Sequence, residues 1–202
     1  MIVSRQNVKC IVVGDDFRFG HNRAGDHELL LKLAPKYGYE LIVVDKLKDN
    51  GRDISSTYIR EEVARGNIKK ANSLLGYPYF IMGRVVHGKQ LGRTIGIPTI
   101  NMLPEAEKIL PPFGVYASKV NVSDKWYLGI TNIGRKPTIE GENPVGVETY
   151  IIDFSQDVYD YVVTVELYDF LRPEKKFDSI EELKEQISGD IVKVIKYYRN
   201  VT

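Results

Sequence analysis

The hydrophobic pattern of the chain changes at Gly76-Tyr77-Pro78, and this change is the feature that most constrains the fold. Before it, short apolar runs alternate with helical patterns, which is typical of α/β domains. Beyond it, short segments rich in aromatic and β-branched residues follow one another, separated by turn residues and not by helices. Such a series predicts an antiparallel sheet that closes into a barrel. The segments are 80–86, 115–122, 126–134, 147–153 and 161–170.

The N-terminal segment is predicted to contain two strands and several short helices. The apolar runs at 8–14 and 40–45 are typical of buried parallel strands, so we expect Cys10, in the first run, to be an inert core thiol. Asp26 and Gly38 flank an amphipathic run, as at the two ends of a helix. Two strands are too few for a stable sheet by themselves, which indicates part of a larger α/β domain. The further expected helix starts are Ser55 or Ser56, and Asn67.

A single amphipathic helix is expected at the C-terminus. Asp178 stands three positions before Glu181, as in a capping box, and is the expected N-cap. Apolar residues then recur at helical spacing, so one face of the helix is expected to pack on the barrel. These residues are Ile180, Leu183, Ile187, Ile191, Val194 and Tyr198.

The overall composition points to no nucleic-acid or membrane partner. The 202 residues carry a net charge of +1, which gives no global indication of binding to nucleic acid or to an anionic membrane. No run approaches the ~20 apolar residues of a transmembrane helix, and the N-terminus has no signal-peptide core. We therefore expect a cytoplasmic protein, and its one cysteine permits no intrachain disulfide.

The stretch GKQLGRTIGIPTIN at 88–101 combines the features of a phosphate-binding loop. Glycines allow a backbone to approach a phosphate closely, and basic side chains neutralise its charge. The Walker pattern is absent, so the stretch is not a P-loop. The alternative is an ordinary glycine-rich turn before a strand. The candidate nucleotide-binding residues are Gly88, Lys89, Gly92, Arg93, Gly96, Thr99 and Asn101.

Thr99 and Asn101, at the end of this stretch, are candidate magnesium ligands. They lie two residues apart, so in an extended segment both side chains point to the same face. Two neutral oxygen ligands on one face suit Mg²⁺, which usually takes waters and substrate phosphates as its other ligands. The alternative is a pair of ordinary polar residues at the start of a strand.

Three motifs in the second half of the chain together resemble riboflavin kinase (flavokinase), in bacteria the C-terminal domain of a bifunctional riboflavin kinase/FAD synthetase. They are GIPTIN at 96–101, VETYIIDF at 147–154 and FLRPEKKFDSIEEL at 170–183, in the family's order and at family-like intervals. The resemblance runs from about Tyr79 to the C-terminus. It implies an enzyme that uses ATP with Mg²⁺ to convert riboflavin to FMN.

The resemblance also implies roles for individual residues. Glu148 has the position of the family's catalytic glutamate, which would accept the proton of the attacking hydroxyl, whereas an ordinary strand glutamate would face solvent. Arg93 stands where the family has a basic residue near the phosphates. Arg172 lies in a loop that closes over the flavin in the family, and its alternative is a surface ion pair with Glu174. NIGRKPT at 132–138 resembles a nucleotide-side loop.

The N-terminal segment resembles the second half of the FMN adenylyltransferase domain of the same bifunctional enzyme. VVGDDFRFGHNRAG at 12–25 and ISSTYIR at 54–60 carry this resemblance. The second motif resembles a phosphate-binding motif of the family, although helix capping explains its serines equally well. The family's opening motif, of the type Gly-x-Phe-Asp-Gly-x-His-x-Gly-His, is absent from this sequence. We therefore expect a truncated segment that makes no FAD and whose unpaired sheet edge favours self-association.

Together these features predict two parts. Residues 1–77 are expected to form a partial, Rossmann-like FMN adenylyltransferase segment of the α/β class, and residues 78–202 a riboflavin kinase β-barrel domain with a C-terminal helix. The expected function is that of a riboflavin kinase. The alternatives are a bifunctional enzyme that retains FMN adenylylation, and a non-catalytic flavin-binding regulatory module. A fragment starting near Tyr79 is expected to fold and bind flavin.

Overall fold

The computed structural model describes residues 6–88, 92, 95–135 and 145–199. By their contacts, the residues fall into two compact units, Met1–Ser55 and Ser56–Thr202. This division comes earlier in the chain than the domain boundary that we expect after Tyr77. The residues between the two positions form helices α3 (Ser56–Ala64) and α4 (Ile68–Leu75), which belong by their contacts to the second unit.

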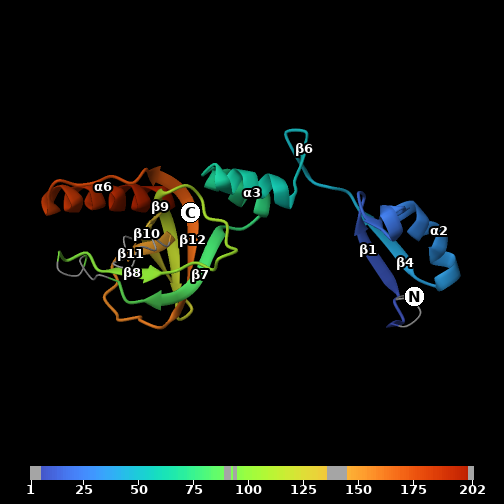
Figure 1. The fold of residues 1–202 in the computed structure, drawn as a ribbon, viewed down its shortest axis with the longest axis horizontal. Coiled ribbons are helices and arrows are strands. Elements are labelled where there is room, and N and C mark those ends of the chain that lie inside the picture. The colour runs from blue at the N-terminus through green and yellow to red at the C-terminus, as the bar shows by residue number, and fades with distance from the viewer. Residues whose placement is uncertain (1–5, 89–91, 93–94, 136–144, 200–202) are drawn as a thin grey trace. The chain divides into compact units, whose positions relative to one another are not determined.

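The first unit is organised around two parallel strands, β1 and β4, with helix α2 between them in the chain (Figure 1). The Asp26 side chain caps α2 by accepting a hydrogen bond from the backbone N–H of Leu29 at 2.9 Å. Gly38 ends the helix in the left-handed region, with φ 69°. The elements are β1 (Cys10–Gly14), β2 (Arg18–Phe19), η1 (His21–Arg23), β3 (Gly25–Asp26), α2 (His27–Tyr37), β4 (Glu40–Val44), β5 (Lys48–Asp49) and β6 (Arg52–Asp53).

The two parallel strands are more exposed than their apolar sequence predicts. Val12 is 61% exposed and Val44 is 52% exposed. The prediction that Cys10 is a buried core thiol is wrong, because this side chain is exposed. Continuous apolar strands are buried when a sheet is covered on both faces. Within the described part of the chain, β1 and β4 pair only with each other, so the pair is too small to enclose its own side chains.

The second unit contains a closed barrel of six antiparallel strands, which confirms the fold expected from the pattern of short strands. The strand order around the barrel is β10-β11-β8-β7-β12-β9. Along β11 the buried side chains Val147 and Thr149 alternate with the half-buried Glu148 and Tyr150, so the strand has an inner and an outer face. The strands are β7 (Tyr79–Val86), β8 (Thr99–Met102), β9 (Gly114–Val122), β10 (Lys125–Arg135), β11 (Val145–Ile151) and β12 (Val162–Arg172).

A small network of hydroxyl groups lies among the apolar side chains inside the barrel. Thr131 donates from Oγ1 to the Ser118 Oγ at 2.8 Å, and its Oγ1 lies 2.9 Å from the Oγ1 of Thr149. The three residues are buried and come from β10, β9 and β11. Because buried hydroxyls are costly without partners, this network favours one register for the three neighbouring strands.

Helix α4 is tied directly to the barrel. Ile68, at its first turn, is 1% exposed and belongs to the same apolar cluster as Ile81 of β7. Asn72 donates from Nδ2 to the carbonyl of Leu167 at 2.8 Å, and its Oδ1 accepts a hydrogen bond from the backbone N–H of Tyr79 at 2.7 Å. The helix therefore contributes both core packing and hydrogen bonds to β7 and β12.

Helix α6 (Ile180–Arg199) lies along one side of the barrel (Figure 1) and packs on it through Val194 and Tyr198. Its N-terminal cap differs from the prediction by one residue. Ser179, and not Asp178, accepts the hydrogen bond from the backbone N–H of Glu182, at 3.1 Å, while a Glu182 carboxylate oxygen accepts from the backbone N–H of Asp178. Aspartate and serine both favour the N-cap position, so the sequence alone does not decide between Asp178 and Ser179. No helix in the described ranges is long and apolar enough to cross a membrane.

The contacts of α4 predict that the barrel alone is less stable than the whole second unit. A fragment 79–202 should have a free energy of unfolding at least about 2–5 kcal/mol lower than the fragment Ser56–Thr202, since it loses a buried isoleucine. Within the longer fragment, Asn72→Ala should cost about 1–3 kcal/mol by leaving buried partners unpaired. Urea unfolding measures both, and equal midpoints for the two fragments would contradict the assignment of α4 to the barrel.

Candidate functional site

The largest described cavity lies between the outer face of the barrel and helix α6, with a volume of about 510 Å³. Strands β8 to β12 form one wall, and the segment after β12 together with the first turns of α6 forms the other. The lining is mostly apolar, with a few polar side chains among it, as is common in small-molecule sites. The residues are Gly92, Ile95, Ile97, Thr99, Val115, Ile130, Asn132, Glu148, Tyr150, Arg172, Glu174, Lys175, Phe177, Ile180, Leu183 and Ile187.

A second, smaller cavity of about 190 Å³ is also lined by strand β8. The Tyr159 ring on its wall stacks on His87, with ring centroids 3.8 Å apart and an interplanar angle of 26°. Thr99 and Asn101 both line this cavity, as does Ile100 between them. Both lie in the extended strand β8, where residues two apart point to the same face. The other lining residues are Val85, Gly88, Pro98, Ile151, Phe154, Ser155, Gln156, Asp157 and Val158.

Thr99 lines both cavities and is hydrogen-bonded to Glu148. The Thr99 hydroxyl donates to a Glu148 carboxylate oxygen at 2.5 Å. The register explains this contact, because Thr99 lies opposite Tyr150 and Asn101 lies opposite Glu148 in the antiparallel pair β8–β11. Thr99 and Glu148 are thus diagonal neighbours on one face, within reach of each other. The structure thus brings together a carboxylate that lines the large cavity, an amide that lines the smaller one, and a hydroxyl that lines both.

Asn101 is held in place by close packing. Asn101 is only 8% exposed, and a Cβ added to Gly88 would lie 2.6 Å from the Asn101 Nδ2. Gly88 is therefore required by the asparagine beside it, and a larger residue would push the asparagine away. Glycine at position 88 is thus explained by the space that Asn101 occupies. Close approach of a phosphate to the backbone would require glycine there as well.

The turn before β8 also depends on its glycines. The carbonyl of Gly92 accepts hydrogen bonds from the backbone N–H groups of Ile95 and Ile97, at 3.2 and 2.8 Å. A Cβ on Gly92 would lie 2.3 Å from the Ile97 carbonyl oxygen, and Gly96 has a φ of 80°. Only Gly92 of these two also lines the large cavity. Lys89 and Arg93, the two candidate phosphate-binding cations, lie outside the residues that the structure describes.

The donors at this junction fit a magnesium ion that is held mainly by its substrate. The Thr99 hydroxyl donates a hydrogen bond to Glu148, so its oxygen lone pairs stay available, and Asn101, which has an amide oxygen, lines the same cavity. Among the described residues there is no group of three or more His, Cys, Asp or Glu side chains suited to a metal. A hard cation with few protein ligands and several from phosphate and water is consistent with this donor set.

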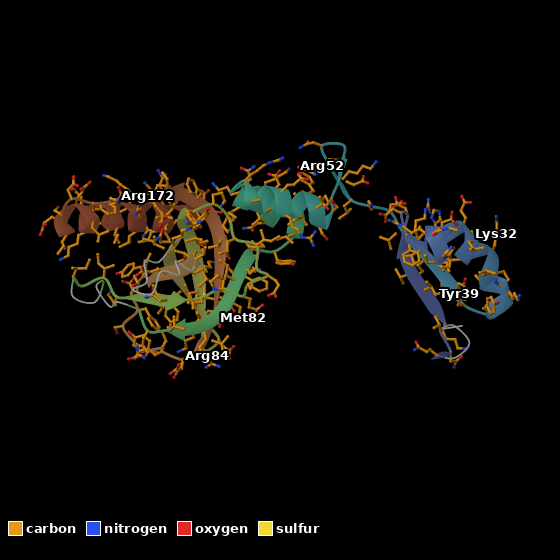
Figure 2. All side chains as sticks on the ribbon, in the orientation of Figure 1. Lys32, Tyr39, Arg52, Met82, Arg84 and Arg172 are labelled. Carbon is orange, nitrogen blue, oxygen red and sulfur yellow. The ribbon has the colours of Figure 1, made fainter. Side chains whose placement is uncertain are left out.

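Arg172 lines the large cavity, but its ion-pair partner is not the one that the sequence suggests. Its Nε donates to an oxygen of Asp190, on α6, at 2.8 Å, and not to Glu174. Figure 2 shows the Arg172 side chain beside this helix. Glu174 instead accepts a hydrogen bond from the Nδ2 of Asn132 at 3.1 Å. A Cβ on Gly134 would lie in contact with Glu174, so the absence of a side chain there leaves room for this carboxylate.

Sequence reasoning missed Asp190, although the sequence carries a signal for it. Asp190 stands three residues after Ile187 and four before Val194, so it falls on the apolar face of the expected helix. A charged residue in that position either breaks the packing or has a buried partner. The partner could not be identified from the sequence, because Arg172 is 18 positions away on another element.

Comparison with known proteins gives a match in each part of the chain. The profile of the family described as Flavokinase: riboflavin kinase matches residues 75–198, and that described as FAD synthetase matches residues 1–58. The bifunctional riboflavin kinase/FMN adenylyltransferases of Escherichia coli K12 and Bacillus subtilis 168 are 42% and 41% identical over 191 and 198 residues. These alignments cover 94% and 96% of this chain but only 60% and 62% of the relatives.

A solved structure has the same fold over nearly the whole chain. The crystal structure described as a macrolide-efflux protein from Streptococcus pneumoniae superposes with a TM-score of 0.81 at 36% identity. The superposition covers 93% of this chain and 60% of that one. The chain thus spans about three fifths of the length of the proteins it matches, with both the α/β segment and the barrel included.

The contact between Gly88 and Asn101 gives a direct structural prediction. Gly88→Ala should displace the Asn101 side chain and cost about 1–3 kcal/mol, since overpacking forces neighbours to move. The side-chain amide signal of Asn101 in a ¹⁵N NMR spectrum reports the displacement. Gly189→Ala on α6 is the matched control, because its added Cβ would meet nothing within 4 Å. That change should stabilise the helix by about 0.5–1 kcal/mol. An unshifted Asn101 signal in the first variant would contradict this account.

Proposed function

Because the chain belongs to the riboflavin kinase family, we propose that it transfers the γ-phosphoryl group of ATP to the 5′-hydroxyl of riboflavin, giving FMN and ADP. The observation that carries this proposal is the position of Thr99, which lines two cavities and is bonded to the Glu148 carboxylate. A phosphoryl transfer needs two substrates to meet beside a base, and this arrangement supports such a meeting.

The large cavity suits the flavin. Its walls contain five isoleucines, one leucine and Phe177, so a flat, mostly apolar ring system can be buried there. The guanidinium of Arg172, which lines the cavity at the end of β12, can hydrogen-bond to or stack on such a ring. The ribityl chain would then extend toward Glu148, which lines the cavity on the barrel side.

The smaller cavity suits the phosphate end of the nucleotide with Mg²⁺, and Thr99 and Asn101 line it. Both side chains would hold the ion, which supplies neutralisation of the phosphate charge when bound. Gly88 lines this cavity, whereas Gly92 lines the large one. Gly92, Gly96, Lys89 and Arg93 are proposed to contribute to phosphate binding, the two cations by adding positive charge.

In the proposed reaction, Glu148 accepts the proton of the riboflavin 5′-hydroxyl as that oxygen forms its bond to the γ-phosphorus. The bond between the γ-phosphorus and the bridging oxygen of ADP breaks at the same step, and ADP leaves with the electron pair. The Thr99 hydroxyl bond orients the Glu148 carboxylate before the substrates arrive. Most of the rate would come from positioning and charge neutralisation, as is general for phosphoryl transfer.

The first unit supports a second candidate function, FMN adenylylation. Its match to FAD synthetase over residues 1–58 favours this, whereas the opening Gly- and His-containing motif is absent from the sequence. This second candidate is tested by whether FAD forms beside FMN in the assay below. The exposed β1–β4 pair is proposed to favour self-association, and a cytoplasmic location is proposed from the ATP-dependent chemistry.

One assay separates these functions. The purified chain is mixed with riboflavin, ATP and Mg²⁺, and the flavins are separated by chromatography. FMN is the product expected of the kinase. FAD in addition would mean that adenylylation is retained, and unchanged riboflavin with measurable flavin binding would mean a non-catalytic module. Size-exclusion chromatography with light scattering tests the self-association, with a monomer at all concentrations as the result that contradicts it.

Glu148→Gln keeps the shape of the side chain but removes the base. Turnover should fall by about 10²–10⁴-fold, the usual contribution of a general base, while riboflavin binding is largely kept. Glu185→Gln, the same chemical change at an exposed position of α6 that does not line the cavity, is the matched control and should change turnover little. Turnover of Glu148→Gln close to that of the unchanged protein would exclude Glu148 as the base.

Thr99→Ala removes an oxygen ligand together with the hydrogen bond to Glu148. The concentrations of Mg²⁺ and ATP that give half-maximal rate should rise together, because the ion bridges the protein and the phosphates. Thr99→Ser, which keeps the hydroxyl, should restore most of both. If the metal dependence of the alanine variant is unchanged, Thr99 is only the first residue of a strand.

A further inference from the structure

We propose that Asp190, on helix α6, is a positioning residue for riboflavin binding that acts through Arg172. The proposal rests on the proposed function, since it assigns the large cavity to the flavin. Asp190 itself does not line that cavity, whereas Arg172 does. The aspartate would act by fixing the orientation of the guanidinium that meets the flavin.

Asp190 is fully buried, with 0% exposure, and is surrounded by donors. One carboxylate oxygen accepts the Arg172 Nε–H at 2.8 Å. The other accepts from the Gln186 Nε2 at 3.1 Å and lies 3.5 Å from the Lys193 ammonium. A buried carboxylate is tolerated only with such partners. Its position is therefore well determined, and so is that of the arginine bonded to it.

Arg172 is held on several sides, and each contact restricts its plane. Its side chain is 16% exposed, its Nε is bonded to Asp190, and its Nη1 donates to the Pro173 carbonyl at 3.3 Å. The guanidinium carbon lies 5.7 Å from the centre of the Phe177 ring. A guanidinium has five N–H donors, so these bonds leave others for a ligand. The fixed plane would present those donors to a carbonyl or ring nitrogen of the flavin.

The ion pair also joins the two walls of the cavity. Arg172 is the last residue of β12, and Asp190 is in the middle of α6, which follows it in the chain. Lys175 and Phe177, which line the cavity, lie in the segment between them. Lys175 is in turn paired with Glu182 of α6 at 2.5 Å, and this ammonium holds the pKa of Glu182 below its usual range. The Arg172–Asp190 pair thus anchors the start of this segment to the helix.

A purely structural ion pair is the competing explanation. Buried ion pairs often add little stability compared with apolar residues of the same size, so burial alone does not assign a role. The two explanations differ in what they predict for ligand binding. A structural pair affects folding and all substrates alike, whereas a positioning residue affects riboflavin selectively and needs Arg172 to do so.

The test compares Asp190→Asn, Arg172→Gln and the double variant, using riboflavin fluorescence quenching for the dissociation constant and FMN formation for KM and kcat. Asp190→Asn should raise the riboflavin dissociation constant and KM by roughly 10-fold, the effect of a misplaced charge-assisted hydrogen bond. The KM for ATP should be unchanged, and kcat should stay within about 3-fold, since Glu148 is not altered. In the Arg172→Gln background, adding Asp190→Asn should have no further effect on riboflavin binding.

Glu185→Gln is the matched control, because it removes the same charge from an exposed position of the same helix. It should leave riboflavin binding unchanged. If Asp190→Asn does not fold, Arg172→Lys tests the same idea, since it keeps a positive charge for Asp190 but loses the planar fork and should bind riboflavin more weakly.

Three results would overturn the proposal: additive effects in the double variant, an equal rise in the KM values for ATP and riboflavin, or unchanged riboflavin binding by Arg172→Lys. Because quenching measures binding without turnover, a protein that binds riboflavin in an Asp190-dependent way but forms no FMN would support this inference while excluding the proposed function.

Discussion

Closure of the barrel depends on its shortest strand. β8 has four residues, pairs with β11 at four positions, and pairs with β7 only at Val85–Met102 and Val86–Asn101. Without these few hydrogen-bonded positions the sheet would have two open edges. The same four residues include Thr99 and Asn101, so the strand that closes the barrel is also the strand between the two cavities. The position of the candidate site is thus a consequence of barrel closure.

Most barrel strands could be predicted because buried residues alternate with more exposed ones, as along β7 and β11, and this alternation is a local property of the sequence. β9 is buried on both faces over most of its length, and its aromatic and β-branched residues indicated it instead. The burial of β1 and β4 could not be predicted in this way, because burial depends on what covers a strand. Cys10 shows the difference: its sequence context is that of a core strand, yet it is exposed. The helix cap at Ser179 was missed by one residue because two adjacent residues both suit an N-cap.

The candidate site was predictable where chemistry and sequence position coincide, and less so where distant elements meet. Thr99 and Asn101 share a face because they are two residues apart in a strand, and this spacing is visible in the sequence itself. Thr99 and Glu148 lie 49 positions apart in the chain, and their hydrogen bond depends on the register between β8 and β11. Local sequence patterns do not specify that register. Asp190 and Arg172 are the same kind of case. The resemblance to riboflavin kinase indicated Glu148 and Arg172 as site residues, and the structure shows their partners, Thr99 and Asp190.

The two hydrogen bonds of Asn72 have a consequence for how such proteins can be recombined. They connect α4 to β7 and β12. An exchange of domains between relatives should therefore keep α3 and α4 together with the barrel. A chimera joined at Pro78 would replace the native partner of the Tyr79 N–H and the Leu167 carbonyl with whatever helix the donor brings. A chimera joined just before Ser56 would keep every one of those bonds. The natural crossover point for shuffling these modules therefore lies at the start of α3, more than twenty residues upstream of the change in sequence pattern.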